Sequence, residues 1–216
     1  MTKINQKPIG ILGGTFNPIH NGHLRLALEL YERLDLAEVR LLPVGQPPHR
    51  EQPTVSSQHR LELVEAAIMG VTGLSLDDRE LRREGLSYMV DTLNSLRQDL
   101  PLRSLCLILG MDAFLGLPKW HQWQRLISLA HILVVNRPNS RLSDDNQTMQ
   151  EFLKKYRTLN KKDLQTQKYG KIWIEEMPML TISSTQIRDI IANGKNPHYL
   201  LPAIVLDKIN TYKLYQ

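Results

Sequence analysis

The chain has 216 residues, a single cysteine and a formal net charge of +5. No apolar run approaches the roughly 20 residues that a membrane-spanning helix needs, and the polar residues 1–7 do not form a secretory signal. One cysteine, Cys106, cannot form an internal disulfide. We therefore expect one domain in a reducing, cytoplasmic setting, with no membrane partner, and the positive charge suits an anionic ligand.

The stretch 8–23 predicts a strand, a glycine loop and the start of a helix. Gly13 and Gly14 let backbone N–H groups approach an anion closely, and a helix N-terminus adds a partial positive charge. His20 and His23 are three residues apart, so both can lie on one side of the first turn. Imidazoles can donate hydrogen bonds to phosphate oxygens, more strongly when protonated. The stretch therefore predicts a polyphosphate site.

Strands and helices alternate along the rest of the chain. We expect helices over 22–34, from Ser56 or Ser57 to about 68, from Ser87 through at least Leu96, from about Trp120 through Trp123, over 147–156, from Ser183 or Ser184 to Gly194, and over 200–212. Strands are expected over 38–44, 74–76, 105–109, 131–136 and 172–175, whereas 77–85 is expected to cross the surface. The alternation predicts an α/β fold, a Rossmann-like doubly wound parallel sheet. We expect a single domain over 1–216, with a small helical C-terminal part over about 182–216.

Polar residues follow several strands, at the sheet edge where open α/β folds bind ligands. His49 and Arg50 lie in a proline-rich loop, and either face substrate phosphate or form a basic surface. Asp112 follows Gly110, where it either contacts ligand hydroxyls or a metal, or caps the next turn. Arg137 ends the strand 131–136 at the same edge.

Trp120 and Trp123 lie three residues apart on an expected helix, which normally indicates core packing. Trp120, directly after Pro118 and at the expected helix start, can instead offer its face to an aromatic ring.

The segment 182–188 carries a second phosphate-binding pattern. Ser183 or Ser184 can cap a helix, and Arg188 is expected on its first turn, opposite an isoleucine face. A plain capped helix needs the serine but not the arginine. The two hydroxyls and the guanidinium therefore predict a second phosphate clamp.

The first pattern resembles the G-G-x-F-x-P-x-H-x-G-H signature of the nucleotidyltransferase superfamily. Nearly the whole chain resembles the bacterial nicotinate-mononucleotide adenylyltransferase family. The matching segments are 13–23, Pro47-Pro48-His49-Arg50, Gly85-Leu86-Ser87-Tyr88, Gly110-Met111-Asp112, Pro118-Lys119-Trp120-His121, Arg137-Pro138 and 182–188.

The resemblance implies a role for each matching residue. The implied catalytic residues are His20, His23 and Arg188. The implied ATP-binding residues are Gly13, Gly14, Thr15, Phe16, His20, His23, Gly110, Asp112, Arg137, Ser183, Ser184 and Arg188. The implied acceptor-binding residues are His49, Ser87, Tyr88, Met89, Trp120 and His121. Trp120 would stack on the pyridine ring, and backbone N–H groups near Tyr88-Met89 and His121 would read its carboxylate.

The activity implied by the resemblance is transfer of AMP from ATP to nicotinate mononucleotide, giving nicotinate adenine dinucleotide and pyrophosphate in NAD biosynthesis. The cofactor implied is Mg²⁺, held mainly by ATP phosphates with no protein ligand. The expected partners are these small molecules, and the sequence does not decide whether the chain forms a homo-oligomer.

Three departures from the family pattern stand out. Asn17 replaces the usual aspartate, and Met89 stands where threonine is expected, which leaves only a backbone role there. Val44-Gly45 replaces an asparagine-bearing stretch, so one substrate contact is undetermined.

Other functions remain open. The same chemistry could act on nicotinamide mononucleotide or phosphopantetheine, although Trp120 and Ser87-Tyr88 disfavour the second. The basic segment 154–171 suggests a non-catalytic RNA-binding module, but a solvated helix and loop explains it more simply, so nucleic acid is the less favoured partner. Glycine spacing disfavours a dinucleotide oxidoreductase.

Overall fold

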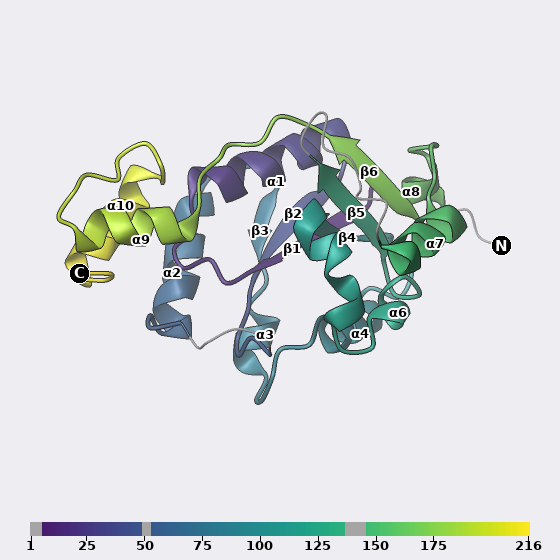
Figure 1. The fold of residues 1–216 in the computed structure, drawn as a ribbon, viewed down its shortest axis with the longest axis horizontal. Helices are drawn as coiled ribbons and strands as arrows, with labels where there is room; N and C mark the ends of the chain where they lie inside the picture. The colour runs from purple at the N-terminus through teal and green to yellow at the C-terminus, as the bar shows by residue number, and fades with distance from the viewer. Residues whose placement is uncertain (1–5, 49–52, 137–145) are drawn as a thin grey trace. The chain divides into compact units, whose positions relative to one another are not determined.

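The computed structural model describes residues 6–48, 53–136 and 146–216. Six strands form one parallel sheet in the order β3-β2-β1-β4-β5-β6 (Figure 1). The strands are β1 Ile9–Gly14, β2 Glu38–Pro43, β3 Leu74–Leu76, β4 Leu105–Gly110, β5 His131–Asn136 and β6 Ile172–Glu176. The chain runs from β1 outward to β3 and then continues from β4 to the other edge. This order confirms the predicted doubly wound α/β fold.

The helices are α1 Asn21–Arg33, α2 Ser57–Ile68, α3 Arg79–Arg82, α4 Met89–Asp99, α5 Met111–Leu115, the 3-10 helix η1 Leu117–Lys119, α6 Trp123–Leu126, α7 Gln147–Tyr156, α8 Asp163–Thr166, α9 Ser184–Ala192 and α10 Ala203–Thr211. Helices α1, α2, α7, α9 and α10 lie close to their predicted positions, whereas α3, α5 and α8 were not predicted. The predicted cap of α2 is confirmed, because the Ser56 hydroxyl accepts a hydrogen bond from the His59 N–H. No helix in the described ranges is long and apolar enough to span a membrane.

The chain divides into two compact units. Unit 1 comprises residues 1–12, 33–38 and 88–178, and unit 2 comprises residues 13–32, 39–87 and 179–216. The prediction of a single domain over 1–216 stays a prediction.

Unit 1 contains the most deeply buried strands. Every residue of β5 is buried, and β4 pairs with it in parallel, with Leu107 opposite Ile132. A near-continuous apolar run is typical of a strand that is covered on both faces. The Arg97 guanidinium donates hydrogen bonds to four backbone carbonyls around these strands, those of Leu100, Arg103, Leu129 and Lys168.

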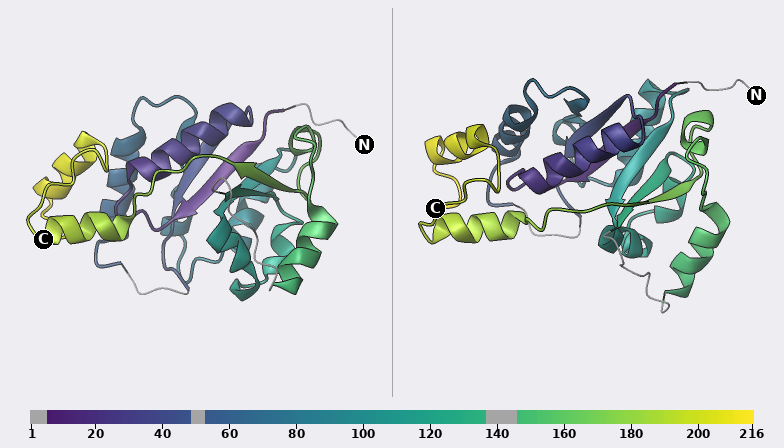
Figure 2. Two further views of the ribbon diagram at one scale, coloured as in Figure 1. Left: turned by 45° about the horizontal axis from the view of Figure 1, so that its top comes forward. Right: turned by 90° about the horizontal axis from the view of Figure 1, so that it is seen from above.

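Unit 2 places its last helix against α2, and Figure 2 shows the two helices side by side in both views. The His59 and Tyr212 rings stack with centroids 4.7 Å apart. The Tyr212 hydroxyl donates a 2.8 Å hydrogen bond to Glu62. The C-terminal segment is thereby fixed to α2.

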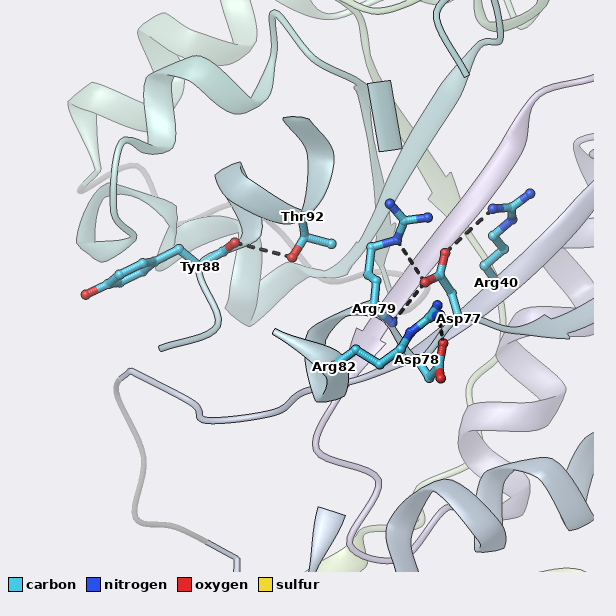
Figure 3. Close-up of polar contacts among 7 residues, drawn as sticks. All are labelled: Arg40, Asp77, Asp78, Arg79, Arg82, Tyr88 and Thr92. Carbon is cyan, nitrogen blue, oxygen red and sulfur yellow. Dashed lines mark hydrogen bonds and ion pairs between the residues drawn. The ribbon is translucent and has the colours of Figure 1, made fainter. Parts of the chain in front are cut away.

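The segment 77–85 does not simply cross the surface as expected. It contains α3, and Asp77 and Glu80 are buried. Figure 3 shows Arg79 and Arg40 directed at the Asp77 carboxylate, with N···O distances of 2.8 Å and 3.6 Å. Arg40 comes from β2, so this pairing depends on a tertiary contact that local sequence does not reveal.

Two predicted helix starts are wrong. The helix expected from Ser87 begins at Met89, with Tyr88 as its N-cap residue. The helix expected across Trp120 is broken: Trp120 ends η1 in an extended conformation, and Gln122 has a left-handed φ of 48°. Trp123 begins α6, is half-buried, and packs its ring edge-on against the buried Phe152, with centroids 5.0 Å apart.

Candidate active site

The glycine-rich loop is shaped by rings packed against its glycines. A Cβ atom at Gly14 would lie 2.8 Å from the Phe16 ring, and one at Gly22 would lie 3.0 Å from the His20 ring. Phe16 is buried and has a φ of 47°, a conformation that costs a non-glycine residue on the order of 1–3 kcal/mol. The surrounding contacts must therefore hold this loop, since the local sequence does not favour it.

The two histidines form one packed cluster. Their rings stack with centroids 3.6 Å apart, and Phe16 meets His23 edge-on at 5.1 Å. The Nδ1 atoms of both histidines are buried and have no hydrogen-bond partner within the described part of the chain. A buried nitrogen without a partner is costly and indicates a place for a ligand.

Burial also sets the charge of this pair. Desolvation lowers the pKa of His20 to about 4, and it lowers the pKa of His23 to about 3 together with the charge of His20. Both imidazoles are therefore neutral at pH 7 in this structure, and each has one N–H to donate. The sequence suggested that protonated imidazoles would be the stronger donors, but this buried environment disfavours the protonated form.

Helix α9 holds the same loop from outside. Ser184 Oγ donates to the Pro18 carbonyl at 2.8 Å, and Arg188 Nη1 donates to the Asn17 carbonyl at 2.9 Å. Ser183 caps the helix, because its Oγ accepts from the Gln186 N–H at 3.1 Å. Arg188 lies in the second turn of α9, not the first as expected. The structure thus brings the two predicted phosphate-binding patterns together within unit 2.

Two further residues hold this loop, and the sequence analysis missed both. The Tyr215 hydroxyl donates to Asn17 Oδ1 at 2.7 Å. Arg60 is buried in α2 and donates to the carbonyls of Thr15 and Val44, each at 2.8 Å. The sequence did carry a signal for Arg60, because it lies at helical spacing on the buried face of α2. Nothing local marks Tyr215.

Ser87 holds the loop after β2. Its buried Oγ accepts from the N–H groups of Gly45 and Gln46, each at 3.2 Å. A Cβ atom at Gly45 would lie 2.5 Å from the Glu80 carbonyl oxygen, so this close approach requires glycine. The Val44-Gly45 departure noted in the sequence therefore has a packing reason.

Four of the residues predicted to bind the acceptor belong to unit 1, namely Tyr88, Met89, Trp120 and His121, whereas Ser87 belongs to unit 2. The rings of Tyr88 and His121 lie 4.4 Å apart, while Trp120 is half-buried. Met89 is the first residue of α4, and its N–H donates to no backbone carbonyl described in the structure. The N-terminal end of α4 thus offers hydrogen-bond donors and a partial positive charge.

At the end of β4, Gly110 is the N-cap residue of α5 and has no side chain with which to cap it. Asp112 is exposed in the first turn of α5, so it does not cap the turn. Among the residues described, no group of three or more histidine, cysteine or acidic side chains could hold a metal. Three residues predicted to face the substrates lie outside the described residues, namely His49, Arg50 and Arg137.

Comparisons with known proteins identify the family of this chain. The cytidylyltransferase-like family model matches residues 11–190. A probable nicotinate-nucleotide adenylyltransferase of Aeromonas hydrophila is 44% identical over 209 residues, 97% of each chain. Another, of Methylococcus capsulatus, is 46% identical over 96% of this chain and 99% of its own.

Solved structures share the fold. Plasmodium falciparum nicotinic acid mononucleotide adenylyltransferase complexed with NaAD superimposes with a TM-score of 0.75 at 17% identity, covering 97% of this chain and 98% of its own. A putative nicotinate-nucleotide adenylyltransferase from Vibrio parahaemolyticus gives a TM-score of 0.64 at 17% identity, covering 97% and 96%. The chain belongs to the cytidylyltransferase-like family and, within it, to the nicotinate-nucleotide adenylyltransferases.

Proposed function

We propose that the protein transfers AMP from ATP to nicotinate mononucleotide, forming nicotinate adenine dinucleotide and pyrophosphate in NAD biosynthesis. Relatives named for this activity are 44% and 46% identical to this chain over nearly its whole length, which supports the reaction. The observation that carries it is the buried pair His20 and His23, whose free Nδ1 atoms lie in a loop held by Ser184 and Arg188.

The reaction needs alignment more than acid–base chemistry. A phosphate oxygen of the mononucleotide attacks the α-phosphorus of ATP, and the bond from that phosphorus to the departing pyrophosphate breaks. The nucleophile is already ionised at neutral pH, so it requires neither a general base nor a covalent intermediate. The protein must bring two anions together and stabilise charge in the transition state.

We assign the phosphate contacts to unit 2. Backbone N–H groups of Gly13, Gly14, Thr15 and Phe16, with the rings of His20 and His23, would bind the ATP phosphates. Ser183, Ser184 and Arg188 would complete this part of the site. Arg188 donates through Nη1 to the Asn17 carbonyl and through Nη2 to the Thr185 hydroxyl, and its five N–H groups leave further donors for phosphate. An arriving polyphosphate would raise the pKa of both histidines, because a nearby negative charge favours the protonated form.

ATP would arrive with a divalent metal, which we propose is Mg²⁺. The donors in the phosphate-binding loop are nitrogen groups, which suit phosphate oxygens, whereas Mg²⁺ takes oxygen ligands. ATP oxygens would therefore be its main ligands. The metal would neutralise phosphate charge when it is bound.

We assign acceptor recognition to unit 1. Trp120 would stack on the pyridine ring, and N–H groups near Tyr88-Met89 and His121 would donate to its carboxylate. The N-terminal end of α4 supports this assignment, because carboxylates bind well there. The side chain at Met89 would matter little, since the contact is through the backbone. Gly110 and Asp112 would lie on the ATP ribose side.

A reducing, cytoplasmic location is part of the proposal. Cys106 is fully buried, and its pKa is raised to about 12 by desolvation. A thiol in that state is unreactive, so it behaves as a small apolar core residue.

One experiment tests the function directly. The protein is incubated with ATP, Mg²⁺ and either nicotinate mononucleotide, nicotinamide mononucleotide or phosphopantetheine, and products are separated by chromatography. We expect nicotinate adenine dinucleotide and pyrophosphate in equal amounts. The catalytic efficiency with nicotinamide mononucleotide should be lower by roughly 10⁴-fold, because its amide would leave hydrogen-bond donors of the site unpaired. Comparable efficiency with the amide indicates dual specificity, and product from phosphopantetheine alone indicates a sister enzyme.

A further inference from the structure

Arg60 is a buried side chain that binds both loops following β1 and β2 in unit 2. Its side chain is 1% exposed. Nη1 donates to the Thr15 carbonyl at 2.8 Å, while Nη2 donates to the Val44 carbonyl at 2.8 Å and reaches the Gly45 carbonyl at 3.5 Å. The guanidinium therefore ties the glycine-rich loop to the loop that Ser87 holds.

The hydrogen bond from Arg60 to the Thr15 carbonyl also orients the N–H of the next residue, Phe16. In a trans peptide the C=O and the following N–H point in opposite directions, so the Phe16 N–H must point away from Arg60. That N–H donates to no backbone carbonyl described in the structure. Phe16 also has the positive φ of 47°. Backbone N–H groups turned outward in such a conformation bind anions.

The charge of Arg60 has no described counterion. The hydrogen bonds of its amino groups all go to backbone carbonyls of described residues, and its buried Nε has no hydrogen-bond partner among them. Tyr215 lies within electrostatic reach, but burial raises the pKa of that phenol, so it stays neutral. Burial also lowers the pKa of Arg60, yet a guanidinium remains charged in proteins. A fixed positive charge thus lies beneath the loop.

We propose that Arg60 is a positioning residue for polyphosphate binding, which orients the Thr15–Phe16 peptide and adds an uncompensated positive charge at the loop. This inference rests on the proposed function, since it concerns the same phosphate site. It assigns Arg60 no contact with the reacting atoms. Its effect passes through the loop, so a substitution at Arg60 should change phosphate binding more than acceptor binding.

The chain offers a matched control in Arg97 of unit 1. Arg97 also donates only to backbone carbonyls among the described residues, its Nε is also buried without a partner, and burial also lowers its pKa. None of the carbonyls it binds belongs to a predicted site residue. A purely structural role for buried arginines predicts the same outcome at both positions.

The test compares Arg60→Met and Arg60→Lys with Arg97→Met and Arg97→Lys. Calorimetry measures the Kd for inorganic triphosphate, steady-state assays measure KM for ATP and for nicotinate mononucleotide, and thermal melting reports folding. We expect Arg60→Met to weaken triphosphate binding and to raise the ATP KM, each by roughly tenfold or more. The acceptor KM should change less than about twofold. Arg60→Lys should recover part of the loss, because it keeps the charge but loses the two-pronged geometry.

Both Arg97 variants should lower the melting temperature without changing triphosphate affinity. Equal affinity in a folded Arg60→Met protein overturns the inference, as does an equal loss in Arg97→Met. If Arg60→Met fails to fold, Arg60→Lys decides by the same criterion. If the unaltered protein forms no dinucleotide, the proposed function fails, and the triphosphate titration still judges Arg60.

Discussion

The two units hold their candidate ligand-binding residues in opposite ways. In unit 2, four side chains bind the segment Thr15–Pro18: Arg60, Ser184, Arg188 and Tyr215. In unit 1, Tyr88 and His121 contact each other through their rings, and Trp120 is half-buried at the end of a short 3-10 helix. The first arrangement fixes donors before an anion binds, and the second leaves aromatic faces open. We infer from this contrast that the proposed phosphate site is preorganised, while the proposed acceptor site depends on stacking and on donors at a helix end.

The largest effect should come from the buried histidine pair. We expect His23→Ala to reduce turnover by about 10²–10³ with either mononucleotide, since it removes a donor aimed at transition-state charge. Steady-state kinetics and thermal melting check this. His59→Ala, which removes a ring stacked on Tyr212 in the same unit, should leave turnover nearly unchanged. A folded His23→Ala protein with near-normal turnover refutes the assignment.

Arg188 should matter next. Arg188→Ala should weaken ATP binding by roughly 10- to 100-fold, which is the scale of one charge-assisted hydrogen bond. Arg188→Lys should rescue only partly, because lysine cannot bind Asn17 and a phosphate with one planar group. Calorimetric titration with ATP measures both. Unchanged affinity in Arg188→Ala means that the residue only holds the loop.

Acid should destabilise the protein through its buried histidines. His20 and His131 have folded pKa values lowered by burial to about 4, and His23 has one of about 3, against 6.5 when unfolded. Between pH 6.5 and 4 the unfolded chain therefore binds more protons, so stability falls as pH falls. The loss at pH 5 should be about 1–2 kcal/mol per histidine.

Urea unfolding at pH 7.5 and pH 5, with and without ATP, measures this loss. ATP should offset it for His20 and His23 but not for His131, which is buried in unit 1. His20→Gln should make the pH dependence shallower. A flat stability profile over this range contradicts the burial argument.

Much of this contrast was visible in the sequence. Both predicted phosphate-binding patterns, the doubly wound parallel sheet and helices such as α7 follow from periodicity, caps and glycines. The contacts that join the patterns could not be predicted, because Arg60 and Arg188 donate to backbone carbonyls, and Tyr215 to the Asn17 side chain, that are remote in the chain. Trp120 was misplaced for a related reason: the residues after Pro118 suit a helix, yet the left-handed Gln122 interrupts it.

A smaller effect should separate the two regions further. Trp120→Ala should raise the KM for both mononucleotides by up to about tenfold, since stacking contributes roughly 0.5–1.5 kcal/mol. The ATP KM should not change, and the preference for the acid should persist. Trp120→Phe keeps an aromatic face and should recover part of the loss. A selective loss of one acceptor would place Trp120 in carboxylate recognition.

We propose that unit 1 reads the nicotinate carboxylate through backbone N–H groups at the start of α4. Met89 occupies the first position of that helix, where proline is well tolerated, and Tyr88 before it has the extended conformation that proline requires. Met89→Pro therefore deletes one donor with little change to the helix, while Met89→Ala keeps it. The decisive measurement is the ratio of kcat/KM for nicotinate mononucleotide to that for nicotinamide mononucleotide. We predict that Met89→Pro lowers this ratio by roughly tenfold or more and that Met89→Ala leaves it unchanged; an unchanged ratio in a folded Met89→Pro protein would contradict the account.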